Sequence, residues 1–232
     1  MCGRFALTIS PAVLAKLFKL ATEPNVTPRY NIAPTQDVAA VRLSADGSER
    51  VLDTLRWGLI PSWANDPAIG ARLINARCET VAEKPAFKEA FQKRRCLIPA
   101  DGFYEWRKPP GKKTTAKKQP MFIRRKDDAP LVLAGLWELW RGPGADLVES
   151  CTILTTAANA LVQPIHDRMP VIIDPNHIDL WLDASGQIPE RLTQLFKPYY
   201  PDQLTAYPVS TLVNSPKNDD PHCLEPIPTQ ID

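Results

Sequence analysis

Long apolar runs, histidines and glycines are all scarce in this chain. No stretch approaches the about 20 consecutive apolar residues of a membrane-spanning helix, and residues 1–20 lack the basic segment followed by an apolar run that marks a secretion signal. We therefore expect a soluble, intracellular protein with no membrane partner. The 10 glycines are outnumbered by 24 prolines, which predicts rigid, irregular connections between the structured elements.

The cysteines lack the patterns typical of a metal site or a disulfide framework. There are 5 of them, an odd number, with no Cys-x-x-Cys pair, and only 3 histidines accompany them. We therefore expect no metal and no cofactor. The four cysteines after Cys2 are interpreted as small buried residues or as surface thiols in a reducing compartment, and they lie at positions 78, 96, 151 and 223.

The overall composition indicates an ordinary globular protein. The chain has 232 residues, of which 44% are hydrophobic and 23% are charged, and its 28 basic and 26 acidic residues leave a net charge of +2. Because the total charge is close to neutral, a surface for nucleic acid would have to arise from local clustering of basic side chains.

The apolar periodicity predicts many strands and a few short helices. Ser10-Pro11 predicts a helix start, Phe87 and Phe91 share one face of a second helix over 84–94, and residues 24–34 are expected to form an extended loop. Late helices are expected at 176–183 and 189–197. Strands are expected at 38–43, 50–60, 95–99, 120–125, 131–139, 150–155, 170–173 and 205–210, with a hairpin turn at Asp46-Gly47. This pattern favours a single mainly-β domain of the α+β class over residues 1–232, because a parallel Rossmann-type sheet would alternate strands and helices regularly.

The second residue is the most distinctive chemical feature. Removal of Met1 would leave Cys2 with a free α-amine and a thiol on adjacent carbons. Ordinary pKa values of about 8 for the amine and about 8.5 for the thiol predict that both groups are partly deprotonated near neutral pH. Such an aminothiol captures aldehydes, because the amine forms an imine and the thiol then closes a five-membered thiazolidine ring.

Three further segments contain candidate catalytic groups. Asn75 and Arg77 would share one face of a strand, either as functional groups or as an ordinary exposed face. Glu105 lies among aromatic residues, where desolvation would raise its pKa and make it a general acid; the alternative is an edge-strand glutamate paired with a lysine. His166 is flanked by apolar residues that lead into a strand, and it is either a proton-transfer group or a structural histidine.

Basic residues supply the candidate contacts to an anion. Arg4, Arg77 and Arg168 would suit a phosphate or a substrate carboxylate, although surface arginines are common. The segment Lys108–Gln119 is rich in lysine and poor in apolar residues. Its composition favours a solvated hairpin tip over an arm that binds nucleic acid.

Taken together, these segments resemble one family, the SRAP (SOS-response-associated peptidase) proteins, which shield abasic sites in single-stranded DNA. The matching blocks run in order over nearly the whole chain. They are MCGRF at 1–5, RYNIAP at 29–34, RWGLIP at 56–61, LINARCET at 73–80, CLIPADGFYEW at 96–106, AGLWE at 134–138, TTAAN at 155–159, IHDRMP at 165–170, and PVS with VNSPKND within 208–220.

The resemblance implies roles for particular residues. Cys2 would be the covalent nucleophile, and the residues that complete its active site would be Asn75, Glu105 and His166. The resemblance also implies a positively charged groove in a mainly-β fold. There the phosphate contacts would come from Arg4, Arg77 and Arg168, and the wall that accommodates the DNA from Asn31, Pro34 and Trp63. The family's basic loop is variable, so no role is carried over to Lys108–Lys118.

The implied function is covalent capture of abasic sites in single-stranded DNA, by a monomer without a cofactor, after Met1 is removed. The protein would protect the lesion during a DNA damage response, in the cytoplasm at the bacterial nucleoid or in a eukaryotic nucleus. One alternative is an N-terminal-nucleophile glutamine amidotransferase, which is disfavoured because Arg4-Phe5 follows the cysteine and no Asn-Gly dipeptide occurs. A second alternative is a thiol peptidase that uses Cys2 with His166, and its minimal activity would be the removal of its own Met1. A third alternative is a module that binds single-stranded DNA and in which Cys2 has no chemical role.

Overall fold

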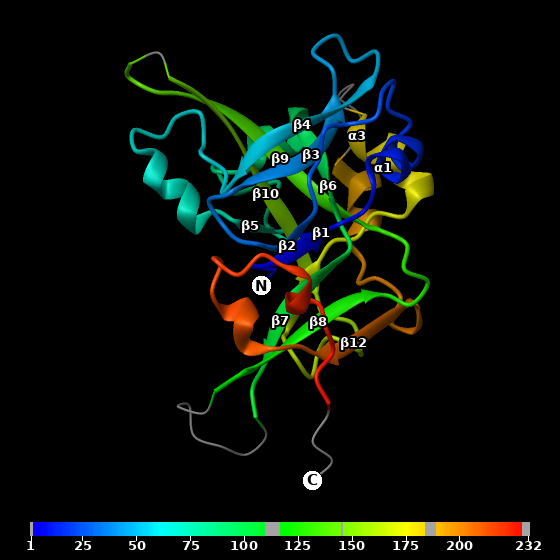
Figure 1. Cartoon of the computed structure of the whole chain (residues 1–232). Helices are drawn as coiled ribbons and strands as arrows, with labels where there is room; N and C mark the ends of the chain where they lie inside the picture. The colour runs from blue at the N-terminus through cyan, green and yellow to red at the C-terminus, as the bar shows by residue number, and fades with distance from the viewer. Residues whose placement is uncertain (1, 110–116, 145, 184–188, 229–232) are drawn as a thin grey trace.

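Two β-sheets form most of the molecule in the computed structural model, which describes residues 2–109, 117–144, 146–183 and 189–228 (Figure 1). The smaller sheet has the order β12-β8-β7-β1-β2, with strands at Leu204–Pro208, Gln119–Arg125, Gly102–Arg107, Phe5–Leu7 and Arg29–Ile32. The larger sheet has the order β11-β10-β4-β3-β6-β9, with β5 also paired to β10. Its strands β3 to β6 and β9 to β11 are Asp37–Leu43, Arg50–Trp57, Asn75–Arg77, Arg95–Ala100, Leu131–Arg141, Leu147–Ala157 and Arg168–Pro170.

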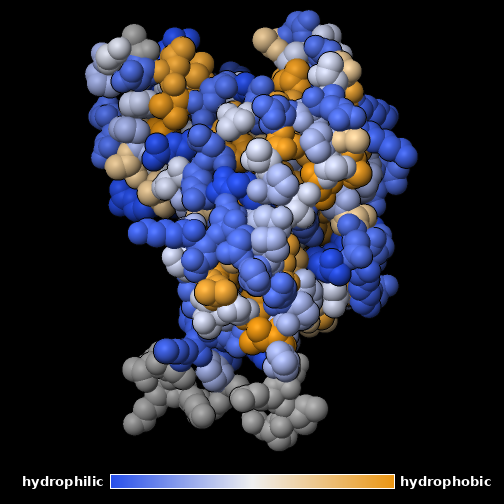
Figure 2. All heavy atoms as spheres, viewed as in Figure 1, coloured by the Kyte–Doolittle hydropathy of each residue, from blue (hydrophilic) through white to orange (hydrophobic). Residues whose placement is uncertain are grey.

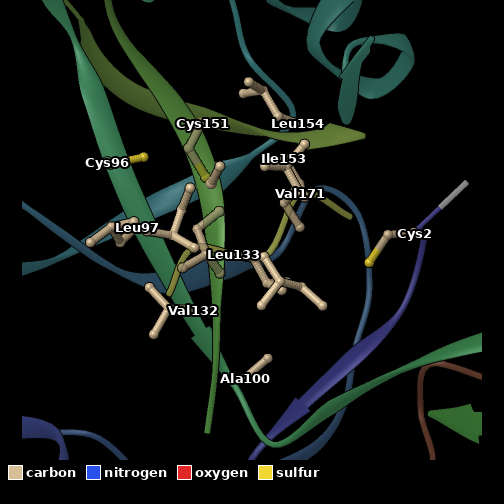
Figure 3. Close-up of a cluster of buried hydrophobic side chains, with 14 of the residues drawn as sticks. Cys2, Cys96, Leu97, Ala100, Val132, Leu133, Cys151, Ile153, Leu154 and Val171 are labelled. Atoms are coloured by element: carbon tan, nitrogen blue, oxygen red, sulfur yellow. The ribbon is translucent and has the colours of Figure 1, made fainter. Parts of the chain in front are cut away.

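Five strands of the larger sheet pair in a closed ring. β4 pairs with β3, β3 with β6, β6 with β9 and β9 with β10, and β10 returns to β4 through a parallel pairing at Ser150 and Arg56. One continuous apolar cluster joins this ring to the smaller sheet, and Figure 3 shows part of it. The contact includes Phe5 of β1 and Trp57 of β4, whose ring centroids lie 5.2 Å apart in an edge-on arrangement.

The helices are short and lie outside the sheets. They are α1 (Pro11–Phe18), α2 (Lys88–Lys93), α3 (Ile178–Leu182) and α4 (Pro189–Thr193), and short 3-10 segments η1 to η6 lie at Pro67–Arg72, Pro175–His177, Gln194–Phe196, Pro201–Gln203, Thr211–Asn214 and Pro221–Cys223. Ser10 caps α1 as expected, because its side chain accepts from the backbone N–H of Val13. Within the described ranges, no helix has the length and apolar character needed to cross a bilayer.

The mainly-β expectation is confirmed, and several details differ from it. The hairpin turn at Asp46-Gly47 is present, with Gly47 at a φ of 73°. Residues 29–32 are not loop but strand β2, which is held by long-range pairing to β1 that no local pattern reveals. The helix expected over 84–94 is helical only over Lys88–Lys93. Met1 and residues 110–116 of the basic segment lie outside the described residues, so the predicted removal of Met1 stays a prediction.

A close contact between two glycine backbones positions β5. Gly58 follows β4 at a φ of +128°, and a Cβ built on it would lie 2.6 Å from the carbonyl oxygen of Gly70. A Cβ on Gly70 would lie 2.5 Å from the carbonyl oxygen of Gly58. Only glycine fits at both positions, and the contact holds η1, and with it the start of β5, against the end of β4.

Candidate active site

Cys2 is fully buried at the margin of the apolar core, as Figure 3 shows. The chain is anchored just after it, because Phe5 pairs with Ile32 of β2 on one side and with Phe103 of β7 on the other. The carbonyl of Arg4 also accepts the backbone N–H of Tyr104, so the segment before β1 runs alongside β7. An N-terminal segment that would ordinarily fray is therefore fixed in the interior.

The thiol of Cys2 is less acidic than an ordinary cysteine thiol. Burial raises its pKa well above the ordinary value, and the nearby carboxylate of Glu105 raises it further. Burial disfavours ionisation of this thiol, because a thiolate loses its hydration in the interior. The expectation of a partly ionised thiol concerned the chain without Met1, and it stays a prediction. All five cysteines are buried free thiols, which confirms the first of the two interpretations of the four later ones, as small buried residues rather than surface thiols.

Asn75 holds the backbone of Cys2. Its Nδ2 donates to the Cys2 carbonyl at 2.9 Å and to the Ile74 carbonyl at 2.7 Å. Its Oδ1 is buried and accepts no hydrogen bond in the described part of the structure. Asn75 is placed by β5, which pairs in parallel with β10 at Ile153. The side chain thus anchors Cys2 with its donor and presents an acceptor that is available to a substrate hydroxyl or amine.

Glu105 lies on β7 and is only 3% exposed. Burial raises its pKa from 4.5 to about 7, the nearby charge of Asp167 adds to the increase, and the cation of Lys118 opposes it. This confirms the expected desolvation of the carboxyl group. A carboxyl group with this pKa is present in both protonation states near neutrality, as a general acid–base group must be.

His166 is neutral, and its tautomer is defined. Its Nδ1 accepts the backbone N–H of Arg168 at 3.0 Å, which requires a lone pair there and leaves the proton on Nε2. The Asp167 carboxylate also lies 3.0 Å from Nδ1. We assign the tautomer from the backbone N–H of Arg168, because its direction is fixed, whereas the Asp167 side chain is 82% exposed and can rotate away. Burial lowers the pKa of His166, and Lys118 lowers it further. The ring is thus an Nε2–H donor near neutral pH.

The predicted catalytic residues are carried by two strand groups that meet at Cys2. β10 holds both β5, with Asn75, and β11, which begins directly after the His166 loop. β7 carries Glu105 and pairs with β1, which follows Cys2 closely in the chain. The charge of Asp167 acts on Glu105, so the loop of His166 lies near that carboxyl group.

The three predicted phosphate-binding arginines differ in their surroundings. Arg77 is exposed. Arg168 makes a two-pronged ion pair with Glu79, at 2.6 Å and 2.8 Å, and also donates to the carbonyl of Thr155. Arg4 is 9% exposed, and its Nη1 donates to the Asn31 side chain and to the Val213 carbonyl. The contact of these arginines with DNA stays a prediction.

The three residues predicted to form the wall that accommodates the DNA differ in burial. Asn31 is fully buried, and its Nδ2 donates to the carbonyls of Val213, Ser215 and Asn218. It therefore ties the C-terminal segment to β2. Pro34 is half-buried, and Trp63 is 58% exposed on the loop after β4.

Sequence reasoning missed two charged residues near the site. Lys118 acts on Glu105 and His166 from the basic segment that was expected to be a solvated tip. Glu79 neutralises Arg168 across 89 positions of sequence. Neither spacing nor periodicity in a sequence reports an ion pair between residues so far apart. The one sequence signal that Glu79 belongs to the site was its place inside the block LINARCET.

Comparisons with known proteins identify the family. The sequence model of the SOS response associated peptidase (SRAP) family matches residues 1–216. The abasic site processing protein YoqW of Bacillus subtilis is 43% identical over 228 residues, which cover 97% of this chain and 99% of that protein. The abasic site processing protein HMCES of Xenopus tropicalis is 34% identical over 98% of this chain and 78% of its own length. A crystal structure of a protein from Bacteroides thetaiotaomicron superimposes with a TM-score of 0.84 at 25% identity, covering 97% of this chain and 100% of that one. The chain therefore belongs to the SRAP family.

Proposed function

We propose that this protein processes abasic sites by capturing them covalently in single-stranded DNA through Cys2, once Met1 has been removed. The observation that carries the proposal is the burial of Cys2 beside a carboxyl group, Glu105, whose pKa is about 7. Relatives that match nearly the whole chain are named abasic site processing proteins, which supports the same substrate. An open abasic deoxyribose carries an aldehyde, and an aminothiol captures aldehydes.

The amine is the first nucleophile in this scheme. It attacks C1′ of the open sugar, and its proton passes to the oxygen to give a carbinolamine. Glu105 then donates its proton to the departing hydroxyl group, which leaves as water, and an iminium ion remains. His166, an Nε2–H donor, would assist the opening of the sugar ring at the ring oxygen. The buried Oδ1 of Asn75 would accept from the hydroxyl or amine.

The thiol completes the ring. Because burial raises the pKa of Cys2, the sulfur keeps its proton until this step. The sulfur then bonds to the iminium carbon, and its proton goes to the Glu105 carboxylate that the previous step produced. One water is released overall, and Glu105 ends protonated. Closure between groups of one residue gains the large effective molarity of an intramolecular reaction, on the order of 10⁵ M or more.

The DNA strand would approach the exposed side of this site. Arg77 is available for a phosphate, and Arg168 would shift from Glu79 to a phosphate or bind one beside it. The face around the N end of the chain is mainly hydrophilic, with hydrophobic residues in small groups (Figure 2). Phosphate contacts of this kind position a strand without reading its bases, as capture of a baseless residue requires.

The experiment is incubation with an abasic single-stranded oligonucleotide, followed by intact mass spectrometry and a denaturing gel. The expected product is a heat-resistant species with the mass of the processed protein plus the oligonucleotide, less one water. Cys2→Ser should stop at an imine that borohydride traps, and Cys2→Ala should give no thiazolidine. Cys96→Ala is the matched control, because Cys96 is an equally buried free thiol elsewhere in the core. Equal crosslinking by Cys2→Ala and the unaltered protein would contradict the proposal.

A thiol peptidase is the rival that the family's name suggests. Cysteine peptidases need a thiolate, usually paired with a histidine. Here burial raises the pKa of the Cys2 thiol, and Nδ1 of His166 is occupied by the backbone of Arg168. These observations favour aldehyde capture over peptide hydrolysis in trans.

A further inference from the structure

The closed ring of five strands has a cavity at one mouth, with a volume of about 600 Å³. Within the ring, β3 lies between β4 and β6. Arg42 of β3 nevertheless pairs with Glu149 of β10 and lies over the indole of Trp137 on β9, so its side chain crosses the interior of the ring. These three residues line the cavity. In Figure 1 this end of the ring carries the hairpin that joins β3 and β4, and the start of the chain lies toward the smaller sheet.

A fixed guanidinium forms the floor of the cavity. Arg42 donates from Nε to Oδ2 of Asp53 at 2.6 Å, and from Nη1 and Nη2 to the two carboxylate oxygens of Glu149 at 2.7 Å and 2.9 Å. The central carbon of the guanidinium lies 4.1 Å from the centroid of the Trp137 indole. These contacts hold the guanidinium plane in one orientation, and the Arg42 side chain keeps 13% exposure. Because a planar guanidinium stacks on aromatic rings, this floor suits a flat, unsaturated ligand.

Two carboxylates supply hydrogen-bond acceptors to the cavity. Asp53 of β4 and Glu149 of β10 both line it, and each side chain is 37% exposed. Arg42 uses Oδ2 of Asp53, so Oδ1 of the same carboxylate keeps its lone pairs for a ligand. N–H groups at the edge of a flat ligand would therefore find acceptors beside the floor.

The end of α2 supplies positive charge to the same cavity. Lys93 is the last residue of α2 and Arg94 is its C-cap, and both line the cavity. The Lys93 side chain is 64% exposed, and its ammonium group lies 3.6 Å from the Glu89 carboxylate, a weak surface pair. Nε of Arg94 is buried and has no hydrogen-bond partner among the described residues. Acceptors from two strands and cations from a helix end suit a ligand with N–H donors at one end and an anion at the other.

We propose that this cavity binds a free guanine nucleotide, of which guanosine monophosphate is the simplest form. The base stacks on Arg42, its N–H edge donates to Asp53 and Glu149, and the phosphate pairs with Lys93 and Arg94. Guanine suits two carboxylates because it places a ring N–H beside an amino group. Small-molecule cavities have volumes of about 300–1,000 Å³ and are common at the mouths of β-barrels. None of these residues belongs to the groups proposed to capture abasic DNA, so the inference is independent of the proposed function.

Isothermal titration calorimetry of the full chain with guanosine monophosphate is the first test. The unaltered protein should bind the nucleotide saturably, and Lys93→Ala should weaken binding by about fivefold, the upper end for an exposed ion pair. Lys88→Ala is the matched control, because Lys88 is exposed on the same helix and lies outside the described lining of the cavity. The control should bind as the unaltered protein does. Equal losses of affinity in the two variants, or no saturable binding at millimolar nucleotide, would overturn the proposal.

Asp53→Asn tests recognition of the base. The amide keeps the size of the side chain and an acceptor for Arg42, but it removes the negative charge that faces the N–H edge of guanine. Guanosine monophosphate should bind about tenfold more weakly, the usual loss for a hydrogen bond to a charged group. Ribose phosphate, which lacks the base, should bind the variant and the unaltered protein alike. Unchanged affinity for guanosine monophosphate in Asp53→Asn would also overturn the proposal.

A nitrogen–proton NMR spectrum of the indole groups tests the position of the ligand in the unaltered protein. Trp137→Phe and Trp106→Phe assign the two signals. Guanosine monophosphate should shift the Trp137 signal, because the base stacks on the guanidinium that covers this indole. The Trp106 signal should stay in place, since Trp106 lies outside the described lining of this cavity. A shift of the Trp106 signal without a shift of the Trp137 signal would show that the nucleotide binds elsewhere, and the proposal would be wrong.

Crosslinking to abasic DNA separates this proposal from the proposed function. Lys93→Ala and Asp53→Asn should crosslink at the normal rate, because both positions lie at the ring mouth, away from Cys2. If the unaltered protein forms no crosslink, the proposed function fails, and the nucleotide titration still decides the cavity.

Discussion

The site has an inner wall, which contains Cys2, Asn75 and Glu105, and a rim, which contains Glu79 and Arg168. The carboxyl groups of these two regions have opposite pKa shifts. On the inner wall, Glu105 is 3% exposed and burial raises its pKa to about 7. At the rim, the Glu79 side chain is 50% exposed, and its hydrogen bonds with Arg168 lower its pKa. The same residue type is thus present in both protonation states near neutrality in one place and is a fixed charge in the other, because desolvation dominates in the interior and ion pairing dominates at the surface.

Under the proposed function, the difference gives the two regions separate tasks. The inner wall contains Cys2, Asn75 and Glu105 and supplies groups that are neutral or change their protonation, as covalent chemistry requires. The rim supplies charges that neither protonate nor deprotonate near neutrality, as phosphate binding requires. Changes on the inner wall should therefore alter the rate of crosslinking, and changes at the rim should alter affinity and its dependence on salt.

The largest expected effect is that of Glu105→Gln on crosslinking. The amide cannot donate and recover a proton, so the rate should fall by about 100-fold or more, the usual contribution of a general acid. The unaltered protein should also lose activity as the pH rises above about 7, because the acid form of Glu105 disappears. A time course on denaturing gels across pH measures both effects. A Glu105→Gln rate within a few fold of normal, with the same pH profile, would remove the general-acid role.

The second effect concerns stability against pH. The pKa of Glu105 rises from 4.5 in the unfolded chain to about 7 in the fold, so the folded state binds more protons between these values. The free energy of unfolding should therefore decrease as the pH rises from about 4.5 to 7, by roughly 3 kcal/mol from this group. Denaturant unfolding at several pH values measures it, and Glu105→Gln should flatten that part of the curve. An unchanged slope in the variant would show that Glu105 is not the group responsible.

A smaller effect is expected for Asn75→Ala. It leaves the Cys2 carbonyl without the 2.9 Å hydrogen bond, which should cost about 1–3 kcal/mol of stability and slow crosslinking by releasing the nucleophile. Thermal unfolding and the crosslinking rate are the measurements. Asn65→Ala, at an exposed asparagine, is the control. If Asn75→Ala loses stability but crosslinks at the normal rate, Asn75 supports the fold alone.

The smallest effect is expected at the rim. Glu79→Gln removes the charge that neutralises Arg168, so single-stranded DNA should bind a few fold more tightly, with a salt slope steeper by about 0.7 for one added phosphate contact. Glu83→Gln is the control, since it removes the same charge at an exposed position nearby. Weaker binding by Glu79→Gln would mean that Glu79 orients Arg168 for the phosphate rather than competing with it.

Local sequence patterns predicted the elements that depend on neighbours in the chain. The capped helix α1, the turn at Gly47 and the strands β3, β8 and β9 follow from periodicity and turn chemistry. Strands β1 and β2 were missed because each is held by pairing with a distant segment. The raised pKa of Glu105 was predictable from its aromatic neighbours, whereas the raised pKa of the Cys2 thiol was not.

By itself, the sequence predicted the candidate reactive groups and determined the family to which the chain belongs. An aminothiol at the N-terminus, a carboxyl group among aromatic residues and a histidine before a strand are all legible in the printed residues. Only the tertiary structure decided their protonation and pairing: that the Cys2 thiol keeps its proton, that His166 carries its proton on Nε2, and that Arg168 is bound to Glu79. The physical reason is that desolvation and ion pairing depend on which distant side chains the sheets bring together, and spacing along a chain does not record that.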